Sequence, residues 1–317
     1  MKMLLCLVVL ALAGQAAESR EAPKAKSPSL ENGSFIAELN SHKIHYEVHG
    51  RGPVLMTVPN SWGLTLEGLR ALYQPLEAHL TLVYFDPRGM GGSGPIREPA
   101  EMGMAAVRAD FQALRKRLGL DRVNVIGWSN GAIDLIFLAS EQPETLSAAI
   151  FLHGNPRFGP EDMKGIAARY PDLLKHFADF RGEMQGTDIP EAEKDARTKE
   201  FDVKVWFPYM FADQEAGRGA LPVMYKDTGF SWRHAQYADE DLPAPYDLRD
   251  RLPKVTAPSL VIAGRHDMLP PERGEEIHAG IPGSTFVVFE KSGHFAPVEE
   301  RVRFQKTVLE FLGVKGP

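Results

Sequence analysis

The fold is decided by one stretch near the middle of the chain, residues 123–131, which reads VNVIGWSNG. Val123 to Ile126 form a short apolar run typical of a buried strand, and residues 130–141 have helical spacing. Ser129 therefore lies on a strand-to-helix turn between Gly127 and Gly131, where the tight turn leaves no room for larger side chains. The helix dipole there favours developing negative charge. Taken alone, the stretch fits a glycine-rich turn with a helix-capping serine equally well.

On both sides of this turn the chain alternates between predicted strands and helices. The pattern predicts an antiparallel pair followed by β-α repeats, which gives a mostly parallel sheet covered by helices on both faces. The predicted strands are 35–39, 43–48, 54–58, 80–85, 122–126, 148–152, 259–263 and 285–289. The predicted helices are 64–79, 102–118, 130–141, 272–279 and 298–312.

The alternation is interrupted once, and this divides the chain. Residues 155–245 are rich in aromatic residues and methionine, and we expect a helical cap inserted into the sheet domain. The sheet domain then consists of residues 34–154 and 246–317, preceded by a solvated linker at 18–33.

The N-terminus has the pattern of an export signal. Lys2 precedes an apolar run over residues 4–12, and small residues follow before the polar stretch begins. The run is short for a hydrocarbon core of about 30 Å, so we favour a cleaved signal peptide at 1–17 over an N-terminal membrane anchor. We therefore expect a periplasmic or secreted protein with no stable membrane insertion after cleavage. Cys6 is the only cysteine and lies inside the run, so the mature chain would have no disulfide or thiol site.

An acid and a histidine follow two later predicted strands. Asp267 comes after the strand at 259–263, and His294 comes after the strand at 285–289. Carboxyl ends of parallel strands share one sheet edge, where ligands bind in such folds. Each residue alone has a commoner structural role, as a helix cap or a hydrogen-bonded loop residue. Together with Ser129 they predict a nucleophile, an orienting acid and a base.

The charge and the histidine positions argue against a nucleic-acid-binding protein and against a metalloprotein. The formal net charge is -6 and no long basic run occurs, which excludes a nucleic-acid-binding surface. His42, His45 and His49 have near-alternate spacing that could serve a metal, but without accompanying carboxylates or thiols we favour a solvated strand face. We therefore predict no metal and no cofactor. His153 is expected only to turn the chain into the cap. His266, beside Asp267, is a weaker candidate base than His294.

From about Ser34 to its C-terminus the chain resembles the α/β-hydrolases. The resemblance rests on residues 86–93, 127–131, 264–267 and 292–299, and on the order Ser, Asp, His. Proline iminopeptidase-like and valacyclovir-hydrolase-like enzymes are the most similar groups, although the latter have Asp where this chain has Asn130. The family usually has His-Gly after the third strand, whereas this chain has Pro59-Asn60-Ser61-Trp62-Gly63. By position, the backbone N–H groups of Ser61 and Asn130 would form the oxyanion hole.

The resemblance implies a serine hydrolase that cleaves a small ester or amide, or a short peptide, through an acyl-enzyme. Trp62, Trp128 and Trp206 are the predicted pocket residues. An aminopeptidase would need a cap carboxylate to bind the substrate ammonium group, and the candidates are Asp202, Asp213, Glu215, Asp239, Glu240 and Asp241. A cofactor-free haloperoxidase-like enzyme, a carbon–carbon-bond hydrolase and a binding protein on the same scaffold stay open. The sequence leaves the oligomeric state undetermined.

Overall fold

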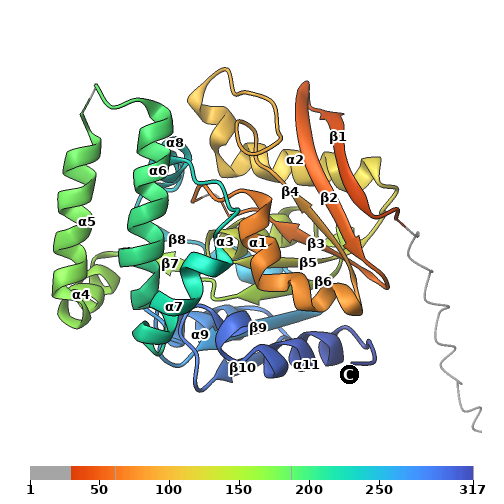
Figure 1. Cartoon of the computed structure of the whole chain (residues 1–317). Coiled ribbons are helices and arrows are strands. Elements are labelled where there is room, and N and C mark those ends of the chain that lie inside the picture. The colour runs from red at the N-terminus through yellow and green to blue at the C-terminus, as the bar shows by residue number, and fades with distance from the viewer. Residues whose placement is uncertain (1–29, 61, 187, 317) are drawn as a thin grey trace, which may run out of the picture.

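A twisted eight-stranded sheet lies at the centre of the protein, with helices on both of its faces (Figure 1). The structure is a computed structural model and describes residues 30–60, 62–186 and 188–316. In spatial order the strands are β1 (Gly33–Leu39), β2 (His42–Gly50), β4 (Thr81–Phe85), β3 (Val54–Val58), β5 (Val123–Trp128), β6 (Leu146–Leu152), β9 (Ser259–Gly264) and β10 (Thr285–Phe289). Strand β2 pairs antiparallel with both of its neighbours, and all the other pairs are parallel.

The helices divide into those that cover the sheet and those that form an inserted region. The covering helices are α1 (Leu66–Tyr73), α2 (Met104–Arg117), α3 (Asn130–Glu141), α9 (Glu272–Gly280), α10 (Ala296–Glu299) and α11 (Arg301–Phe311). The inserted helices are α4 (Pro160–Arg169), α5 (Pro171–Met184), α6 (Glu191–Phe201), α7 (Gln214–Met224) and α8 (Trp232–Asp241). Figure 1 shows the inserted helices at the end of the molecule away from β1 and β2.

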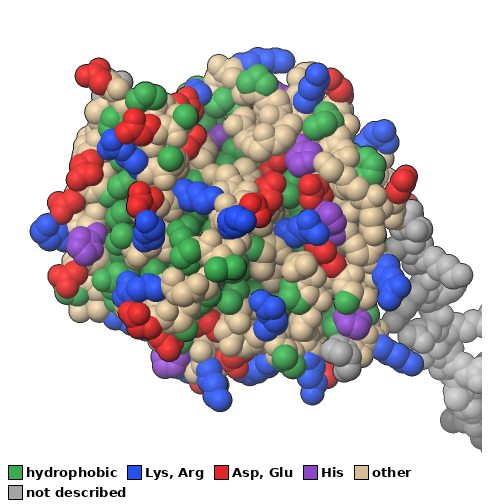
Figure 2. All heavy atoms as spheres, in the orientation of Figure 1, with side chains coloured by type: hydrophobic (Ala, Val, Ile, Leu, Met, Phe, Trp, Pro, Cys, Tyr) green, Lys and Arg blue, Asp and Glu red, His purple; other side chains and the backbone are tan. Residues whose placement is uncertain are grey.

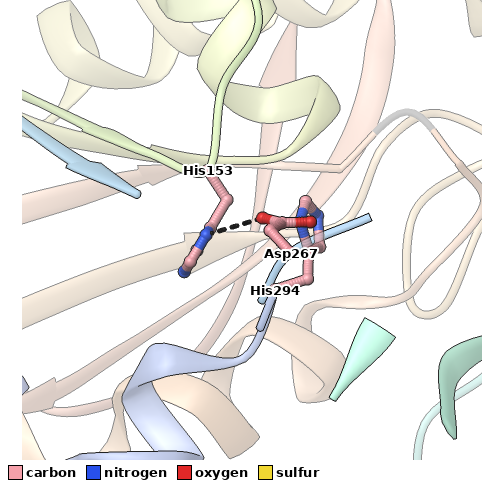
Figure 3. Close-up of side chains that lie close together, drawn as sticks. All are labelled: His153, Asp267 and His294. Carbon is pink, nitrogen blue, oxygen red and sulfur yellow. Dashed lines mark hydrogen bonds and ion pairs between the residues drawn. The ribbon is translucent and has the colours of Figure 1, made fainter. Parts of the chain in front are cut away.

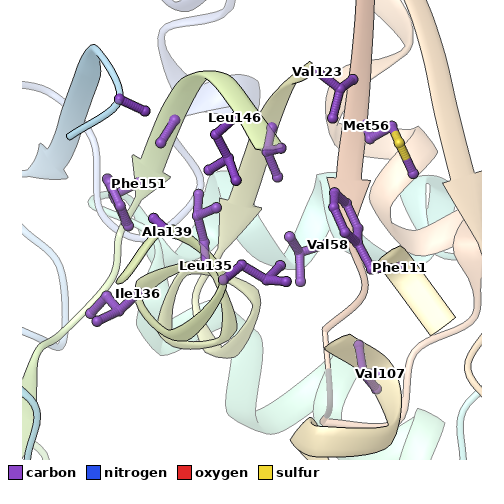
Figure 4. Packing of buried hydrophobic residues seen from close by; sticks show 14 of the residues in the cluster. Met56, Val58, Val107, Phe111, Val123, Leu135, Ile136, Ala139, Leu146 and Phe151 are labelled. Atoms are coloured by element: carbon purple, nitrogen blue, oxygen red, sulfur yellow. The ribbon is translucent and has the colours of Figure 1, made fainter. Parts of the chain in front are cut away.

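The central strands are buried on both faces, which explains their continuous apolar sequences. Every residue of β3, β4 and β9 is buried, as expected for parallel strands between two helix layers. One core cluster lies between the sheet and α2, α3 and α9, where Val58, Phe111 and Leu135 pack together (Figure 4). A second cluster lies on the opposite face beneath α1 and α11.

The predicted mostly parallel sheet and the inserted helical region are both confirmed. The turn between the first two strands lies at Asn40 and Ser41, both of which have positive φ. The predicted helix over 298–312 is instead two helices that meet at Glu300, whose φ of -124° and ψ of 49° are not helical. The inserted region is joined to the sheet domain by two short strands that the sequence did not reveal, β7 (Arg157–Phe158) and β8 (Tyr246–Asp247), which pair antiparallel.

The predicted solvated strand face at His42, His45 and His49 of β2 is wrong. The three histidines do not form a solvated face, because His42 is buried, His45 and His49 are partly buried, and Gly92 of the loop after β4 lies against the His45 ring. Each imidazole pairs with a carboxylate: His42 with Glu101 at 3.2 Å, His45 with Asp86 at 2.7 Å and His49 with Glu47 at 2.7 Å.

The predicted signal peptide and most of the linker lie outside the described residues, so export stays a prediction. Within the part of the chain that the structure describes, no helix is both long and apolar enough to cross a bilayer. On the face shown in Figure 2, acidic and basic side chains are interspersed. A mixed surface of this kind lacks the concentrated basic patch that phosphate backbones require.

A buried ring of the core gives a stability prediction. Phe111 of α2 is fully buried, and its ring lies 6.5 Å from that of Phe85 between their centroids. We expect Phe111→Ala to lower the free energy of unfolding by about 3–5 kcal/mol, through lost burial and a residual cavity. Urea unfolding measures this loss. Val302→Ala, at an exposed position of α11, should change it by less than about 0.5 kcal/mol. Equal losses in the two variants would contradict the packing described.

Candidate active site

Ser129 lies on a strained turn between β5 and α3. Its φ is 54°, a left-handed value that is rare for a residue with a side chain. The two flanking glycines allow this turn. A Cβ on Gly127 would lie 2.2 Å from the carbonyl oxygen of Gly131, and one on Gly131 would lie 2.8 Å from that of Val58. The turn therefore exposes the Ser129 side chain at the N-terminus of α3, where the first backbone N–H groups have no intrahelical partner.

Asp267 and His294 meet at the same edge of the sheet. Asp267 follows β9, His294 follows β10, and both side chains are buried. The Nδ1 atom of His294 lies 2.8 Å from Oδ2 of Asp267, and the backbone N–H of Leu269 donates to Oδ1 at 3.0 Å. Burial opposes ionisation of Asp267, but the neighbouring histidines outweigh it and hold its pKa well below the usual range. Asp267 is therefore ionised and fixes the orientation of the His294 ring.

A second histidine, which the sequence interpretation assigned to a simple turn, contacts the same carboxylate. Nδ1 of His153 lies 2.9 Å from Oδ2 of Asp267, the oxygen that also bonds His294 (Figure 3). His153 follows β6 directly and is buried, and burial lowers its pKa. The sequence did contain one indication of this contact: His153 follows a predicted parallel strand, at the sheet edge that also holds Asp267.

Ser129, Asp267 and His294 line one cavity of about 380 Å³. The three predicted pocket tryptophans, Trp62, Trp128 and Trp206, also line it, as does Asn130. The Trp128 indole N–H donates to the carbonyl oxygen of His294 at 3.0 Å. Most of the remaining wall is apolar, with contributions from Leu64, Met104, Ile133, Phe158, Met163, Ile166, Leu174, Phe177, Phe207, Met210, Leu242, Met268 and Leu269.

The loop after β3 forms another part of the cavity wall. Asn60 is buried, lines the cavity, and accepts a hydrogen bond from the backbone N–H of Trp62 at 2.8 Å through Oδ1. Ser61 itself lies outside the described residues, so its oxyanion role stays a prediction.

The inserted helical region is bonded to the loops that carry Asp267 and His294. Arg169 of α4 donates to the carbonyl oxygens of Asp267 at 2.7 Å and His266 at 3.0 Å. The carbonyl oxygen of Met210 accepts the backbone N–H of His294 at 2.6 Å. These bonds make the placement of both loops depend on the inserted region.

Glu299 adds a further connection beside His294. Its carboxylate accepts the backbone N–H groups of Ala212 at 2.7 Å, Gly293 at 2.9 Å and Phe295 at 3.3 Å. Burial raises the pKa of Glu299 to about 7, although the three N–H groups oppose this rise.

The predicted ammonium-binding carboxylates do not reach the cavity. Among the described side chains, none of the candidates lines it. Asp213 caps α7, Glu215 pairs with Arg218, and Asp241 accepts the backbone N–H of Met104. Asp202 is buried elsewhere and Glu240 is exposed, whereas the side chain of Asp239 is not described.

The described residues contain one group of donors close enough together to hold a metal ion, namely His153, Asp267 and His294. Both imidazoles direct Nδ1 at the carboxylate in hydrogen-bond geometry, so hydrogen bonds account for their proximity. The side chain of His266 is exposed, whereas that of His294 is buried against Asp267.

Comparison with known proteins gives a consistent result. The sequence profile described as the alpha/beta hydrolase fold matches residues 58–301. A pimeloyl-(acyl-carrier protein) methyl ester esterase from Aeromonas salmonicida is 27% identical over 85% of this chain and 99% of its own length. A proline iminopeptidase from Saccharolobus solfataricus is 23% identical over 91% of this chain and 94% of its own length. An alpha/beta fold family hydrolase from Bacillus anthracis superposes with a TM-score of 0.70 at 21% identity, covering 88% of this chain and 99% of that chain.

The close approach at the turn gives a second prediction. We expect Gly127→Ala to destabilise the protein by several kcal/mol, since its Cβ would lie 2.2 Å from a backbone oxygen and either β5 or α3 must move. Thermal unfolding measures the effect. Gly165→Ala is the matched control, because Gly165 lies within α4 with open space around it, and alanine should stabilise the helix by about 0.5–1 kcal/mol. A Gly127→Ala protein as stable as wild type would show that the turn is not tightly packed.

The raised pKa of Glu299 gives a third prediction. Between about pH 4.5 and 7 the folded protein keeps a proton that the unfolded chain has lost, so this residue makes the free energy of unfolding fall as pH rises. Urea unfolding across that range should therefore show a steeper fall for wild type than for Glu299→Gln. The control Glu310→Gln, at an exposed site, should keep the wild-type slope. Identical slopes in all three proteins would contradict the raised pKa.

Proposed function

Because the chain belongs to the α/β-hydrolase fold family, we propose that it is a serine hydrolase that cleaves a small, neutral ester with an apolar acyl group. The composition of the cavity carries this proposal. Asp267 is the one carboxylate in the described wall, and His294 engages it. The volume of about 380 Å³ lies at the small end of ligand pockets, which supports a small-molecule substrate.

The proposed reaction follows from the hydrogen bonds of His294. Because Nδ1 bonds Asp267, Nε2 is the nitrogen left to accept the Ser129 proton. Ser129 then attacks the ester carbonyl, and the alcohol leaves after taking a proton from His294. Water, activated by the same imidazole, hydrolyses the acyl-enzyme and regenerates Ser129.

The developing oxyanion needs donors in place before the reaction. The backbone N–H of Asn130, at the start of α3, is the first proposed donor, and the N–H of Ser61 is the second by position in the chain. The bond from the Trp62 N–H to Asn60 Oδ1 connects the residues on either side of Ser61 beside the cavity, which is consistent with this assignment. Removal of one such donor typically costs about 3–4 kcal/mol of transition-state stabilisation.

The apolar wall of the cavity favours an ester substrate over a peptide with a free amino terminus. An ammonium group in an apolar cavity needs a partner carboxylate, because an unpaired buried charge is strongly unfavourable. The described cap carboxylates lie elsewhere, so a free α-amino group would have no partner among them. Asn60, Asn130, Asn155 and Tyr246 supply neutral polar contacts that suit a carbonyl or ether oxygen.

The test is turnover of p-nitrophenyl acyl esters of increasing chain length, beside proline and other amino-acid p-nitroanilides. We expect ester kcat/KM to rise about fourfold for each added methylene until the cavity is full, since each buried methylene contributes about 0.8 kcal/mol. The anilides should turn over far more slowly.

Two variants complete this experiment. Ser129→Ala should lower ester kcat by about 10⁴-fold or more while the protein stays folded. The control Ser34→Ala, which alters a serine that bonds His45 outside the cavity, should retain activity. Faster turnover of the proline anilide would instead favour an aminopeptidase, and no turnover of either set by folded wild type would contradict the hydrolase proposal.

A further inference from the structure

The Asp267 carboxylate carries an unusual set of hydrogen bonds. Its Oδ2 atom accepts Nδ1 of His294 at 2.8 Å and Nδ1 of His153 at 2.9 Å, while Oδ1 accepts the Leu269 N–H. Figure 3 shows the two imidazoles approaching the carboxylate from different sides. An ionised carboxylate only accepts hydrogen bonds, so both rings must carry their proton on Nδ1. The two histidines therefore share one oxygen.

His153 is held in this position at a cost. Its φ is 52°, which is strained for a residue with a side chain. Its Nε2 is buried and finds no hydrogen-bond partner among the residues described. Both penalties would vanish with glycine or an apolar residue in an ordinary turn. Strain and an unpaired buried atom that persist beside a reacting group indicate a role for that side chain.

The position of His153 limits what that role can be. Its side chain has no exposed surface and does not line the cavity, so it does not contact substrate. Burial lowers its pKa, so it approaches Asp267 as a neutral N–H donor. A neutral N–H group donates one hydrogen bond to the carboxylate but brings no positive charge, so it does not replace the charge attraction between Asp267 and a protonated His294.

We propose that His153 is a positioning residue that fixes the Asp267 carboxylate and, by sharing Oδ2, lowers the basicity of His294. This inference rests on the proposed function, in which His294 is the base. Without the His153 donor, the carboxylate would hold the His294 imidazolium more tightly. The base would then stay protonated to higher pH, and its carboxylate would lose one of three bonds that fix its orientation.

Other ionisable groups also face this carboxylate and must stay constant in any test. Arg169 of α4 bonds the Asp267 carbonyl oxygen, and Tyr170 and Glu299 interact with Asp267 through charge. His266 lies next to Asp267 with its side chain exposed. None of the His153 substitutions below alters these groups.

The decisive measurement is the NMR titration of the His294 ring in the folded protein, assigned by its loss in His294→Gln. His153→Gly removes the donor and relieves the strained φ. We expect it to raise the His294 midpoint by about half to one pH unit, the equivalent of one net hydrogen bond. His153→Asn keeps an N–H near the position of Nδ1 and tolerates positive φ, so its midpoint should stay near that of wild type. The control His266→Asn should also leave it unchanged.

Each possible outcome either supports or contradicts the proposal. An unchanged midpoint in His153→Gly, or equal shifts in the Gly and Asn variants, would overturn it. If His153→Gly does not fold, the ¹⁵N shifts of His153 in wild type decide: a proton on Nε2 contradicts the shared donor, and a proton on Nδ1 supports it. None of these measurements uses a substrate. Absence of ester turnover would therefore contradict the proposed function and leave the His153 result standing.

Discussion

Close backbone contact at the carboxyl edge of the sheet is the constraint on which the site depends. The strained Ser129 turn is possible because Gly127 and Gly131 have no side chains. A Cβ atom at either position would collide with backbone atoms of α3 or of the end of β3. A similar close contact at glycine occurs beside Asp267 and His294. A Cβ on Gly264, at the end of β9, would lie 2.0 Å from the carbonyl oxygen of Gly293, next to His294. Strand ends packed this tightly bring residues far apart in sequence into one small volume.

Much of this arrangement was predictable because it arises from local pattern. The buried strands are continuous apolar runs, and a parallel sheet requires such runs. The segment 127–131 has glycine on both sides of serine and lies between a predicted strand and a predicted helix, and this context identifies the turn. Asp267 and His294 follow strands that must end at one edge, so their proximity follows from the direction of the strands. The predicted strands 54–58 and 285–289 match the structure at both ends.

The features that were missed depend on contacts between distant segments. His153 follows a strand as Asp267 and His294 do, but a histidine before a glycine also fits an ordinary turn, and the hydrogen bond to Asp267 spans 114 residues. His42 and His45 of β2 were misjudged because their partners Glu101 and Asp86 lie far along the chain, whereas the partner of His49, Glu47, is only two residues away. The cavity has no ammonium partner among the described cap carboxylates, and this depends on which way each cap helix faces. The sequence alone does not specify that orientation.

The bonds from the inserted helices to the loops that carry Asp267 and His294 determine whether the cap could be exchanged. Arg169 holds the backbone beside Asp267, and Met210 and Ala212 hold the segment around His294. The cap is consequently not an independent module, because the positions of Asp267 and His294 depend on its contacts. A cap taken from a relative would have to supply a donor in place of the Arg169 side chain and backbone groups at the positions of Met210 and Ala212. A side-chain change within the existing cap leaves the backbone bonds of Met210 and Ala212 in place, so the cavity wall can change while the segment around His294 keeps its position.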